Sequence, residues 1–333
     1  MKKYLNTKEM TLIECFKIID DLNSSKVMKV HISGGEPFLH SNICEIIEYL
    51  KYKNMRYSIS TNGTIINENI LKSILDYSPD FIGISHPSIS NHECENRGMR
   101  KLNHKVNQTI KKLLKYKLNV SVGFTITKTN MQFILDSIRF LEDIGVDTFG
   151  FQFICPIDYE SINEIPNYFE YKMFINSVTD AILNRDIASK ILINTTNESK
   201  IPWEMYLPLK NRIEDLKKVW GYDYNKIDGI EVNSCTAGKF GAAIDSYGNV
   251  FGCEMFFNYN KLAYGNIFEE NIVDIWNNRK LLNTQKRRLQ GKCSKCNLDI
   301  CSGSCRAAAM YYRDVAYSDL RCPYNPYLKN GIK

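Results

Sequence analysis

The stretch "HISGGEPFLH", residues 31–40, joins the end of a short apolar run to two glycines, a glutamate and a proline. Two consecutive glycines are more than an ordinary turn requires, and they leave bare backbone that a ligand can approach closely. Glu36 adds a carboxylate, which needs polar partners wherever it is buried. The stretch therefore indicates that something is bound at the end of a β-strand.

Strand-like and helix-like segments alternate along the first half of the chain, with short connections between them. This alternation predicts a parallel sheet or an α/β barrel, in which right-handed crossovers bring the carboxyl ends of the strands to one edge. The segments "SGGEP", "STNG", "SHPS" and the residues after Ile154 all fall at that edge. The five expected strands cover residues 27–33, 56–63, 80–85, 119–127 and 148–154.

The overall composition is that of a globular protein. Hydrophobic residues make up 44% of the 333 residues and charged residues 24%, and the net charge of +6 is mild. No long basic run favours nucleic-acid binding, and no apolar stretch is long enough to span a membrane. The N-terminus lacks the apolar core of a secretory signal, so we expect a cytoplasmic protein.

The cysteines are concentrated near the C-terminus. Seven of the eleven fall between Cys235 and Cys322, and they include a C-x-x-C pair at Cys293 and Cys296. In a cytoplasmic chain such clustering indicates metal binding rather than disulfides, because a C-x-x-C turn aims both sulfurs at one metal. Seven cysteines exceed the capacity of one tetrahedral ion, so two centres are expected; a pair of structural zinc sites is the simplest alternative.

This spacing resembles the SPASM domain, the auxiliary-cluster domain at the C-terminus of many radical S-adenosylmethionine (SAM) enzymes. Residues 301–324, "CSGSCRAAAMYYRDVAYSDLRCPY", resemble the closing segment of that domain, although four residues separate Cys296 from Cys301 where five are usual. The resemblance implies two [4Fe–4S] clusters, one bound by Cys293, Cys296, Cys301 and Cys322 and the other by Cys235, Cys253 and Cys305. The second of these clusters lacks an obvious fourth cysteine, because Gly241 stands where some relatives supply one.

The "SGGEP" stretch resembles the GGEP motif of radical SAM enzymes, whose backbone meets the amino group of the SAM methionine. Arg97, in "NRG", matches an arginine that holds the SAM carboxylate, a role that suits a guanidinium group. Where relatives often read S-x-D-G, "SHPS" keeps the serine and lacks the acidic residue. The implied SAM-binding residues are Ser33, Gly34, Gly35, Glu36, Ser60, Asn62, Ser85, Arg97 and Asn130.

Glu254 follows Cys253 directly, where sulfatase-maturing relatives carry an acidic residue that takes up the substrate proton. By resemblance Glu254 is a candidate catalytic base. The alternative is an ordinary solvent-exposed carboxylate on the hairpin that we predict around "DSYGN", residues 245–249.

The chain has no C-x-x-x-C-x-x-C motif, which radical SAM enzymes use to bind the [4Fe–4S] cluster that cleaves SAM. We expect the chain to be truncated, with the first strand and this loop encoded before Met1, because a barrel without its first strand exposes a sheet edge. The alternatives are a degenerate relative without SAM chemistry and a second polypeptide that supplies the loop.

The expected architecture is α/β: a partial (β/α)6 radical SAM barrel without its first strand in residues 1–155, a last barrel helix and connector in 156–231, and a SPASM iron-sulfur domain in 232–333. The resemblance implies an oxidoreductase or maturase that cleaves SAM to a 5′-deoxyadenosyl radical and modifies a peptide or protein substrate. Flavodoxin or ferredoxin is the expected electron donor. The alternative is a non-catalytic relative that serves as an iron-sulfur electron-transfer or peptide-binding partner.

Overall fold

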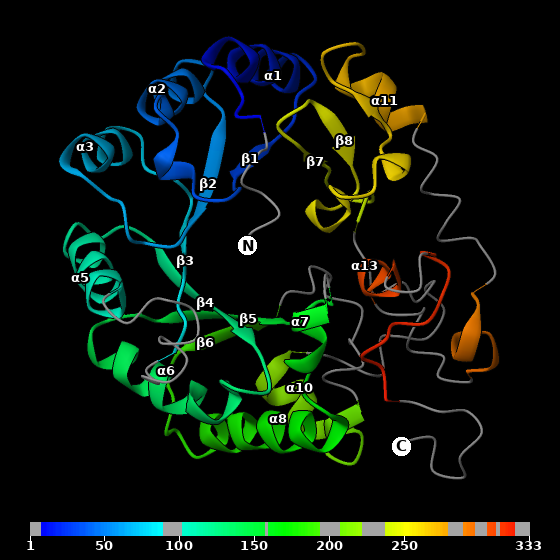
Figure 1. The fold of residues 1–333 in the computed structure, drawn as a ribbon. Helices are drawn as coiled ribbons and strands as arrows, with labels where there is room; N and C mark the ends of the chain where they lie inside the picture. Colours follow the sequence, from blue (N-terminus) through cyan, green and yellow to red (C-terminus); the bar gives the residue numbers. More distant parts are fainter. Residues whose placement is uncertain are drawn as a thin grey trace.

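The computed structural model describes residues 8–88, 102–156, 159–193, 207–221, 237–278, 289–296, 305–310 and 314–323. Six parallel strands form one sheet in the order β1-β2-β3-β4-β5-β6 (Figure 1). They are β1 (Lys29–Ile32), β2 (Arg56–Thr61), β3 (Ile82–Ser85), β4 (Val120–Ile126), β5 (Thr148–Phe153) and β6 (Lys190–Ile193). The five strands predicted from the sequence are confirmed, and β6 extends the sheet into the segment that was expected to hold only a helix and a connector.

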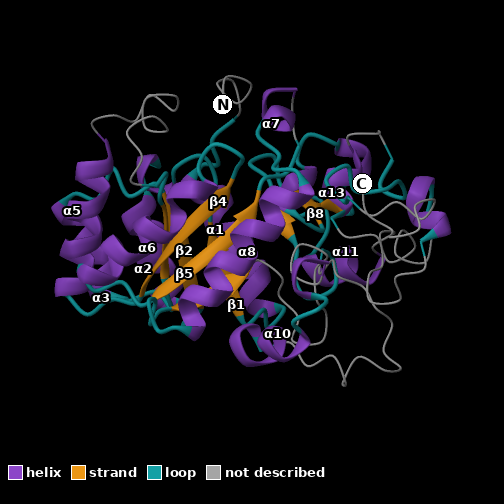
Figure 2. Ribbon diagram, turned by 90° about the horizontal axis from the view of Figure 1, so that it is seen from below, coloured by secondary structure: helices purple, strands orange, loops and turns teal. Residues whose placement is uncertain are grey.

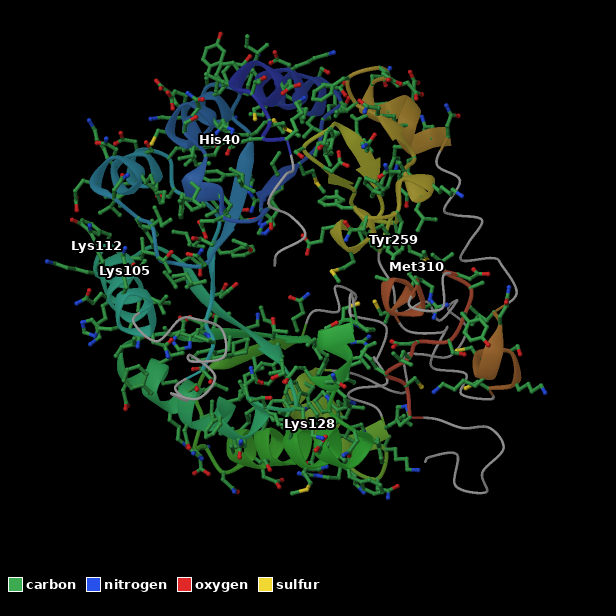
Figure 3. The ribbon with its side chains drawn as sticks, viewed as in Figure 1. His40, Lys105, Lys112, Lys128, Tyr259 and Met310 are labelled. Atoms are coloured by element: carbon green, nitrogen blue, oxygen red, sulfur yellow. The ribbon has the colours of Figure 1, made fainter. Side chains whose placement is uncertain are left out.

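Helices follow the strands and cover the outer side of the sheet (Figures 1 and 2). Their polar side chains face water: Lys105 and Lys112 project outward from α5 in Figure 3, and Lys112 pairs with Glu68 of α3. The helices are α1 (Leu12–Ser24), α2 (Ile43–Tyr52), α3 (Glu68–Asp76), α5 (Leu102–Lys115), α6 (Ile134–Asp143), α7 (Tyr159–Asn163), α8 (Tyr168–Leu183) and α10 (Ile213–Trp220).

The two faces of the sheet differ sharply in chemistry. Successive side chains of a strand point to opposite faces, and β3 to β5 alternate between buried and accessible positions. In β2, Ser58 is buried as well as its neighbours Tyr57 and Ile59. The face under the helices is apolar and carries Tyr57, Ile59, Ile82, Ile84, Val120, Val122, Phe124, Phe149 and Phe151. The opposite face, called here the inner face, carries His31, Ser58, Ser60, Gly83, Ser121, Gly123, Thr125, Gly150 and Gln152.

This asymmetry is informative because a parallel sheet is ordinarily covered on both faces and reads as a continuous apolar run. Here the glycines align across the inner face: Gly123 is paired with Ser85 on one side and with Gly150 on the other. The inner face is therefore suited to line a polar space beside the sheet rather than a second hydrophobic core.

The C-terminal part is a small unit that lies beside the sheet (Figures 1 and 2) and shares its main apolar core through Val250, Ile267, Ile272 and Ile275. The hairpin predicted around residues 245–249 is confirmed as β7 paired with β8, and β9 adds a third antiparallel strand. Its elements are β7 (Ala243–Ile244), β8 (Asn249–Phe251), β9 (Gly265–Asn266), α11 (Ile272–Asn278) and α13 (Arg306–Ala309), with short 3-10 turns at Glu254–Phe256, Asn260–Leu262 and Gly291–Lys295.

The small unit has its own apolar core, built from Phe251, Phe256, Ala307, Met310 and Val315. Tyr259 packs against this core, and Figure 3 shows it close to Met310. The segment after β8 and helix α13 are thus held together although they are about fifty residues apart in the sequence, a distance over which only tertiary packing can hold them.

Helix α1 joins the first part of the chain to this unit. The helix begins with a capping box, in which Thr11 and Glu14 satisfy each other's backbone amides. Farther along, Asp21 accepts a hydrogen bond from the amide of Ile272 at 2.8 Å, and Lys17 donates to the carbonyl of Phe268 at 3.0 Å. The carboxylate of Asp21 lies at the start of α11, where the helix dipole favours a negative charge.

A buried ion pair makes the second connection. Arg321 and Asp319 pair at 2.8 Å, with side chains only 5% and 0% exposed. Arg321 also donates to the carbonyls of Phe153 and Ile154 at the end of β5, both at 3.4 Å, and Asp319 accepts from the amide of Cys305 at 3.4 Å. The pair thus links the carboxyl end of the sheet to the cysteine-bearing segment.

Among the described residues no helix is long and apolar enough to cross a membrane.

The substitution Arg321→Met tests this link. It leaves the Asp319 carboxylate buried without its guanidinium partner, so we expect a loss of about 3 kcal/mol in the free energy of unfolding. Arg56→Met is the matched control, because Arg56 pairs with Asp80 at the surface and its loss should cost about 0–1 kcal/mol. Chemical denaturation of the cluster-free protein measures both, and equal losses in the two variants would contradict the assignment.

Candidate functional site

The loop after β1 presents open backbone. Gly34 has a φ of +146°, a backbone conformation that residues other than glycine rarely adopt. A Cβ built on Gly34 or Gly35 would meet no atom within 4 Å. Both glycines and the preceding Ser33 are exposed. The space beside the two glycines is therefore open, and the binding of SAM by Ser33, Gly34 and Gly35 stays a prediction.

Glu36 is engaged within the protein. Its carboxylate accepts hydrogen bonds from the Thr61 hydroxyl at 2.7 Å, from the Asn62 amide at 2.7 Å and from the Phe38 amide at 3.2 Å. These contacts clamp the loop after β1 to the loop after β2, while Pro37 and Phe38 anchor it in the core. The contacts of the Glu36 side chain in the described residues thus make it a brace for the glycine backbone.

The two residues proposed from the "STNG" loop are also held by neighbours. The side-chain oxygen of Asn62 accepts from the amide and the hydroxyl of Thr64, at 2.8 and 2.6 Å, which closes a tight turn. Ser60 lies on the inner face, with its hydroxyl 2.9 Å from Nε2 of His31. Asn62 shapes the loop, whereas Ser60 belongs to the surface that a ligand would meet.

His31 is a polar residue of the inner face for which the sequence predicts no role. Its Nδ1 lies 2.8 Å from the Ser58 hydroxyl, and its ring stacks on Phe81 with centroids 5.8 Å apart. Partial burial, and secondarily the charge of Lys29, lowers the pKa of His31. The alternation of β1 places His31 on the same face as Ser58 and Ser60.

The loop after β3 is organised by His86, which is 2% exposed. Its Nδ1 accepts from the amide of Ser88 at 3.1 Å, so Nε2 carries the hydrogen and donates to Asn107 of α5 at 3.1 Å. Burial lowers the pKa of His86 to about 4. Ser85, at the end of β3, is exposed on the inner face, and Arg97 lies outside the described residues.

Asn130 is buried and braces the loop after β4. Its side chain accepts from the amide of Thr127 at 2.9 Å and donates to the carbonyl of Thr125 at 2.8 Å, and its own amide donates to the Thr127 hydroxyl at 3.2 Å. These contacts all stay within the turn. The role of Asn130 toward SAM stays a prediction, and the structure shows how it fixes the shape of the strand end.

The predicted cluster ligands are in part outside the described residues. Cys235 and Cys301 fall there, whereas Cys253, Cys293, Cys296, Cys305 and Cys322 are described, half-buried and free of disulfides. Lys292 donates to the carbonyl of Cys322, and the Cys293 amide donates to Ser318 at 3.2 Å, so these segments adjoin. Within the described ranges no group of three or more histidine, cysteine or acidic residues is arranged to hold a metal ion; each predicted set has one member beyond those ranges.

One close thiol pair joins the two parts of the protein. Cys155, just after β5, and Cys305, at the start of α13, are hydrogen-bonded through their side chains. The bond, together with burial, raises the pKa of Cys155, and the bond lowers the pKa of Cys305. Thiolates are the form of cysteine that binds metals. Cys155 is not among the cluster ligands predicted from the sequence.

Comparison with known proteins agrees with this geometry. The sequence model of the radical SAM superfamily matches residues 2–141, and that of the SPASM iron-sulfur cluster-binding domain matches residues 235–297. The chain carries a radical SAM domain and a SPASM domain. The first match covers strands β1 to β4 and ends within α6, and the second match begins ahead of the β7–β8 hairpin.

The similar proteins differ in what their names say they make. The chain is 23% identical to Fe-coproporphyrin III synthase of Methanosarcina barkeri, over 94% of this chain and 80% of that protein. It is 26% identical to the subtilosin biosynthesis protein AlbA of Bacillus subtilis, over 85% of this chain and 57% of AlbA. It is 20% identical to the mycofactocin maturase MftC of Mycolicibacterium smegmatis, over 91% of this chain and 72% of MftC.

Solved structures show the same fold. SuiB of Streptococcus suis superposes with a TM-score of 0.73 and 19% identity, over 95% of this chain and 72% of SuiB. The protein anSMEcpe with bound AdoMet superposes with a TM-score of 0.68 and 17% identity, over 94% of this chain and 84% of that protein. The chain thus resembles radical SAM enzymes in sequence and in fold.

The residues present fit the two kinds of cofactor that these domains imply. Free thiols are the donors that iron-sulfur clusters use, and the SPASM segment supplies them without disulfide partners among the described cysteines. For SAM, the glycine backbone of the radical SAM domain provides space that a Cβ would fill.

Glu254 is exposed at the start of its 3-10 turn, and its role as a base stays a prediction.

Glu36→Gln tests the clamp between the two loops. The amide replaces one acceptor oxygen by a donor that faces other donors, so we expect a loss of about 2 kcal/mol in the free energy of unfolding. Glu45→Gln is the matched control, because Glu45 is exposed in the first turn of α2 and accepts only from Asn42. A loss for Glu36→Gln no larger than that of the control, measured by chemical denaturation, would refute the clamp.

His86 predicts a pH dependence of stability. The pKa of His86 lies near 4 in the folded protein, below the ordinary 6.5. Between pH 6.5 and pH 4, His86 therefore binds a proton in the unfolded chain and not in the folded chain. Stability is thus lost as pH falls below 6.5 toward 4, by about 2 kcal/mol between pH 7 and pH 5. Denaturation curves of wild type and His86→Gln at both pH values measure it; the variant should lose this part of the slope, and an unchanged slope would contradict the assignment.

Proposed function

We propose that the chain is the SAM-binding and auxiliary-cluster part of a radical SAM/SPASM enzyme that oxidatively modifies a peptide or protein. The carrying observation is the open Gly34–Gly35 backbone, clamped by Glu36 at the same strand edge whose β5 end is tied to the cysteine segment. SAM, when reduced by a [4Fe–4S] cluster, supplies a 5′-deoxyadenosyl radical that abstracts hydrogen. The protein's part is to position, enclose and orient.

The radical SAM domain offers different residues for different parts of SAM. The backbone of Gly34 and Gly35 would bind the amino group of the methionine, and the hydroxyls of Ser60 and Ser85 lie at strand ends on the same face. Arg97 would pair with the carboxylate. The Cβ positions of Gly123 and Gly150 come no closer than 3.9 Å to another atom, so the centre of the inner face leaves room for a ligand against the sheet.

The peptide substrate is supported by the relatives rather than by a feature of the inner face. AlbA and MftC are named as a bacteriocin biosynthesis protein and a maturase, and SuiB has been solved with its precursor peptide SuiA. The similarity to Fe-coproporphyrin III synthase makes a porphyrin the competing substrate to test. A flavodoxin or ferredoxin is the proposed electron donor.

Residues 1–333 contain no C-x-x-x-C-x-x-C motif, so the proposal needs thiolates from outside these residues for the SAM-cleaving cluster. The second candidate function follows from this: a protein with auxiliary clusters that binds a partner and does not cleave SAM. The open glycine backbone favours the enzyme, because an electron-transfer module has no use for a SAM-binding loop.

SAM binding tests the loop directly. Gly34→Val introduces a side chain at a φ of +146° and fills the open space, so SAM affinity should fall at least about tenfold, which is about 1.4 kcal/mol. Gly221→Val is the matched control, because Gly221 also has a positive φ and open surroundings but ends α10. Calorimetric titration measures both, and equal affinities in the two variants would contradict the loop's role.

Catalysis is tested on the chain with any in-frame upstream residues included. After anaerobic reconstitution and reduction, the enzyme should release 5′-deoxyadenosine, and iron should exceed the about eight atoms per chain that two [4Fe–4S] clusters account for. Candidate peptides and coproporphyrin are compared as substrates. Iron at or below that level together with intact SAM would favour the non-catalytic alternative.

A further inference from the structure

His31 lies on the inner face of β1 and makes two hydrogen bonds to the next strand. Its Nδ1 lies 2.8 Å from the hydroxyl of Ser58, and its Nε2 lies 2.9 Å from the hydroxyl of Ser60. His31 is paired with Ser58 in the register, and Ser60 is two residues farther along the same face. Because the ring also stacks on Phe81, the imidazole is held through both of its nitrogens and through its face.

The two serines differ in how accessible they are. Ser58 is 1% exposed, and its hydroxyl has no hydrogen-bond partner other than His31 among the described residues. Ser60 is half-buried and His31 is exposed, so both can meet a ligand on the inner face. Ser60 is paired on its other side with Gly83 of β3, where a Cβ would come within 3.3 Å of the Ser60 hydroxyl oxygen. The glycine thus leaves that side of the hydroxyl open.

The buried hydroxyl of Ser58 decides which nitrogen of His31 carries the hydrogen. If Nδ1 donated to Ser58, the hydrogen of that hydroxyl would be buried without an acceptor among the described residues, which is costly. The hydroxyl of Ser58 therefore donates to Nδ1, and a neutral imidazole whose Nδ1 accepts carries its hydrogen on Nε2. Partial burial lowers the pKa of His31, which favours the neutral ring.

This tautomer sets the polarity of Ser60. Because Nε2 of His31 donates to the Ser60 oxygen, the hydrogen of Ser60 does not point back at the ring. It is free to donate across the inner face, on the side that Gly83 leaves open. The next residue, Thr61, donates to Glu36, so Ser60 stands directly beside the clamp that holds the glycine loop. Ser60 is thus prepared to donate to an acceptor atom near that loop.

We propose that His31 is a positioning residue that fixes the Ser60 hydroxyl as a hydrogen-bond donor to an oxygen of SAM. SAM offers two kinds of acceptor oxygen, the carboxylate of its methionine part and the hydroxyls of its ribose. The hydrogen bonds run from Ser58 through the imidazole to Ser60, and no proton is transferred along them. This inference rests on the proposed function, because it requires SAM to bind at the inner face.

Calorimetric titration of the full chain with SAM tests the role of His31. Ser60→Ala removes the hydrogen bond to the ligand and should lower the affinity about tenfold. His31→Phe leaves the hydroxyl of Ser60 free to rotate and should lower the affinity about fivefold. Because both changes affect the same contact, the double variant should lose about tenfold, whereas independent effects would multiply to about fiftyfold.

A rescue variant and a control separate positioning from a purely structural role. His31→Gln keeps an N–H donor and an acceptor oxygen, so it should recover most of the affinity for SAM that His31→Phe loses. His104→Phe is the control, because His104 is an exposed histidine of α5 that bonds only Gln108, and it should match wild type. A histidine that only ties β1 to β2 would affect the free energy of unfolding and leave the affinity for SAM unchanged.

A second ligand identifies the acceptor oxygen. The compound 5′-methylthioadenosine keeps the ribose of SAM and lacks its carboxylate. If Ser60→Ala weakens the binding of both compounds, the acceptor is a ribose oxygen. If Ser60→Ala weakens the binding of SAM alone, the acceptor is the carboxylate.

The tautomer is measured without any ligand, by NMR of the cluster-free chain, because the two ring nitrogens of a neutral histidine differ in chemical shift. We expect the hydrogen of His31 on Nε2. Hydrogen on Nδ1, or effects of His31→Phe and Ser60→Ala that multiply in the double variant, overturns the inference and leaves the proposed function standing. A wild-type chain that binds no SAM overturns both. Circular dichroism and thermal unfolding check that each variant keeps the folded structure.

Discussion

The structure depends on one buried ion pair. Asp319 and Arg321 bring together the end of β5 and the start of α13, two segments about 150 residues apart in the sequence. An ion pair without exposure is costly to desolvate, and it is stable only because each polar atom finds further partners, here backbone carbonyls for Arg321 and amides for Asp319. The relative placement of the sheet and the cysteine segment follows from it.

The second constraint is the asymmetry of the sheet. The helices bury an apolar face with large side chains, while the inner face carries serine, threonine, glycine and histidine. A polar face of a parallel sheet is stable when it borders a space for water or ligand. The open glycine loop stands at the edge of that face, and Cys155 follows β5 at the same carboxyl edge of the sheet.

Much of this follows from the sequence. The alternation of apolar runs predicts five of the strands within a few residues, and the "DSYGN" turn predicts the hairpin. Strand β6 escapes prediction because residues 190–193 are short and lie in a segment with mixed polarity. The open backbone of Gly34 and Gly35 also follows from the sequence, because a doubled glycine has few structural uses.

The details of the site are harder to foresee. Glu36 bonds across to the loop after β2, whereas the side chains of Asn62 and Asn130 bond within their own loops, and only the structure reveals these contacts. Cys155 escapes notice because it stands alone in the sequence, and its neighbour Cys305 is 150 positions away. His31 is hidden in the same way, since Ser58 and Ser60 belong to the next strand.

The central claim is that iron-sulfur clusters sit where the carboxyl edge of the sheet meets the SPASM segment. Anomalous diffraction at the iron absorption edge, from crystals of the anaerobically reconstituted chain, locates the metal directly. The account predicts iron density beside Cys253 and Cys305 and a second site beside Cys293, Cys296 and Cys322. Density for single zinc ions at these positions, or iron remote from the end of β5, would contradict it.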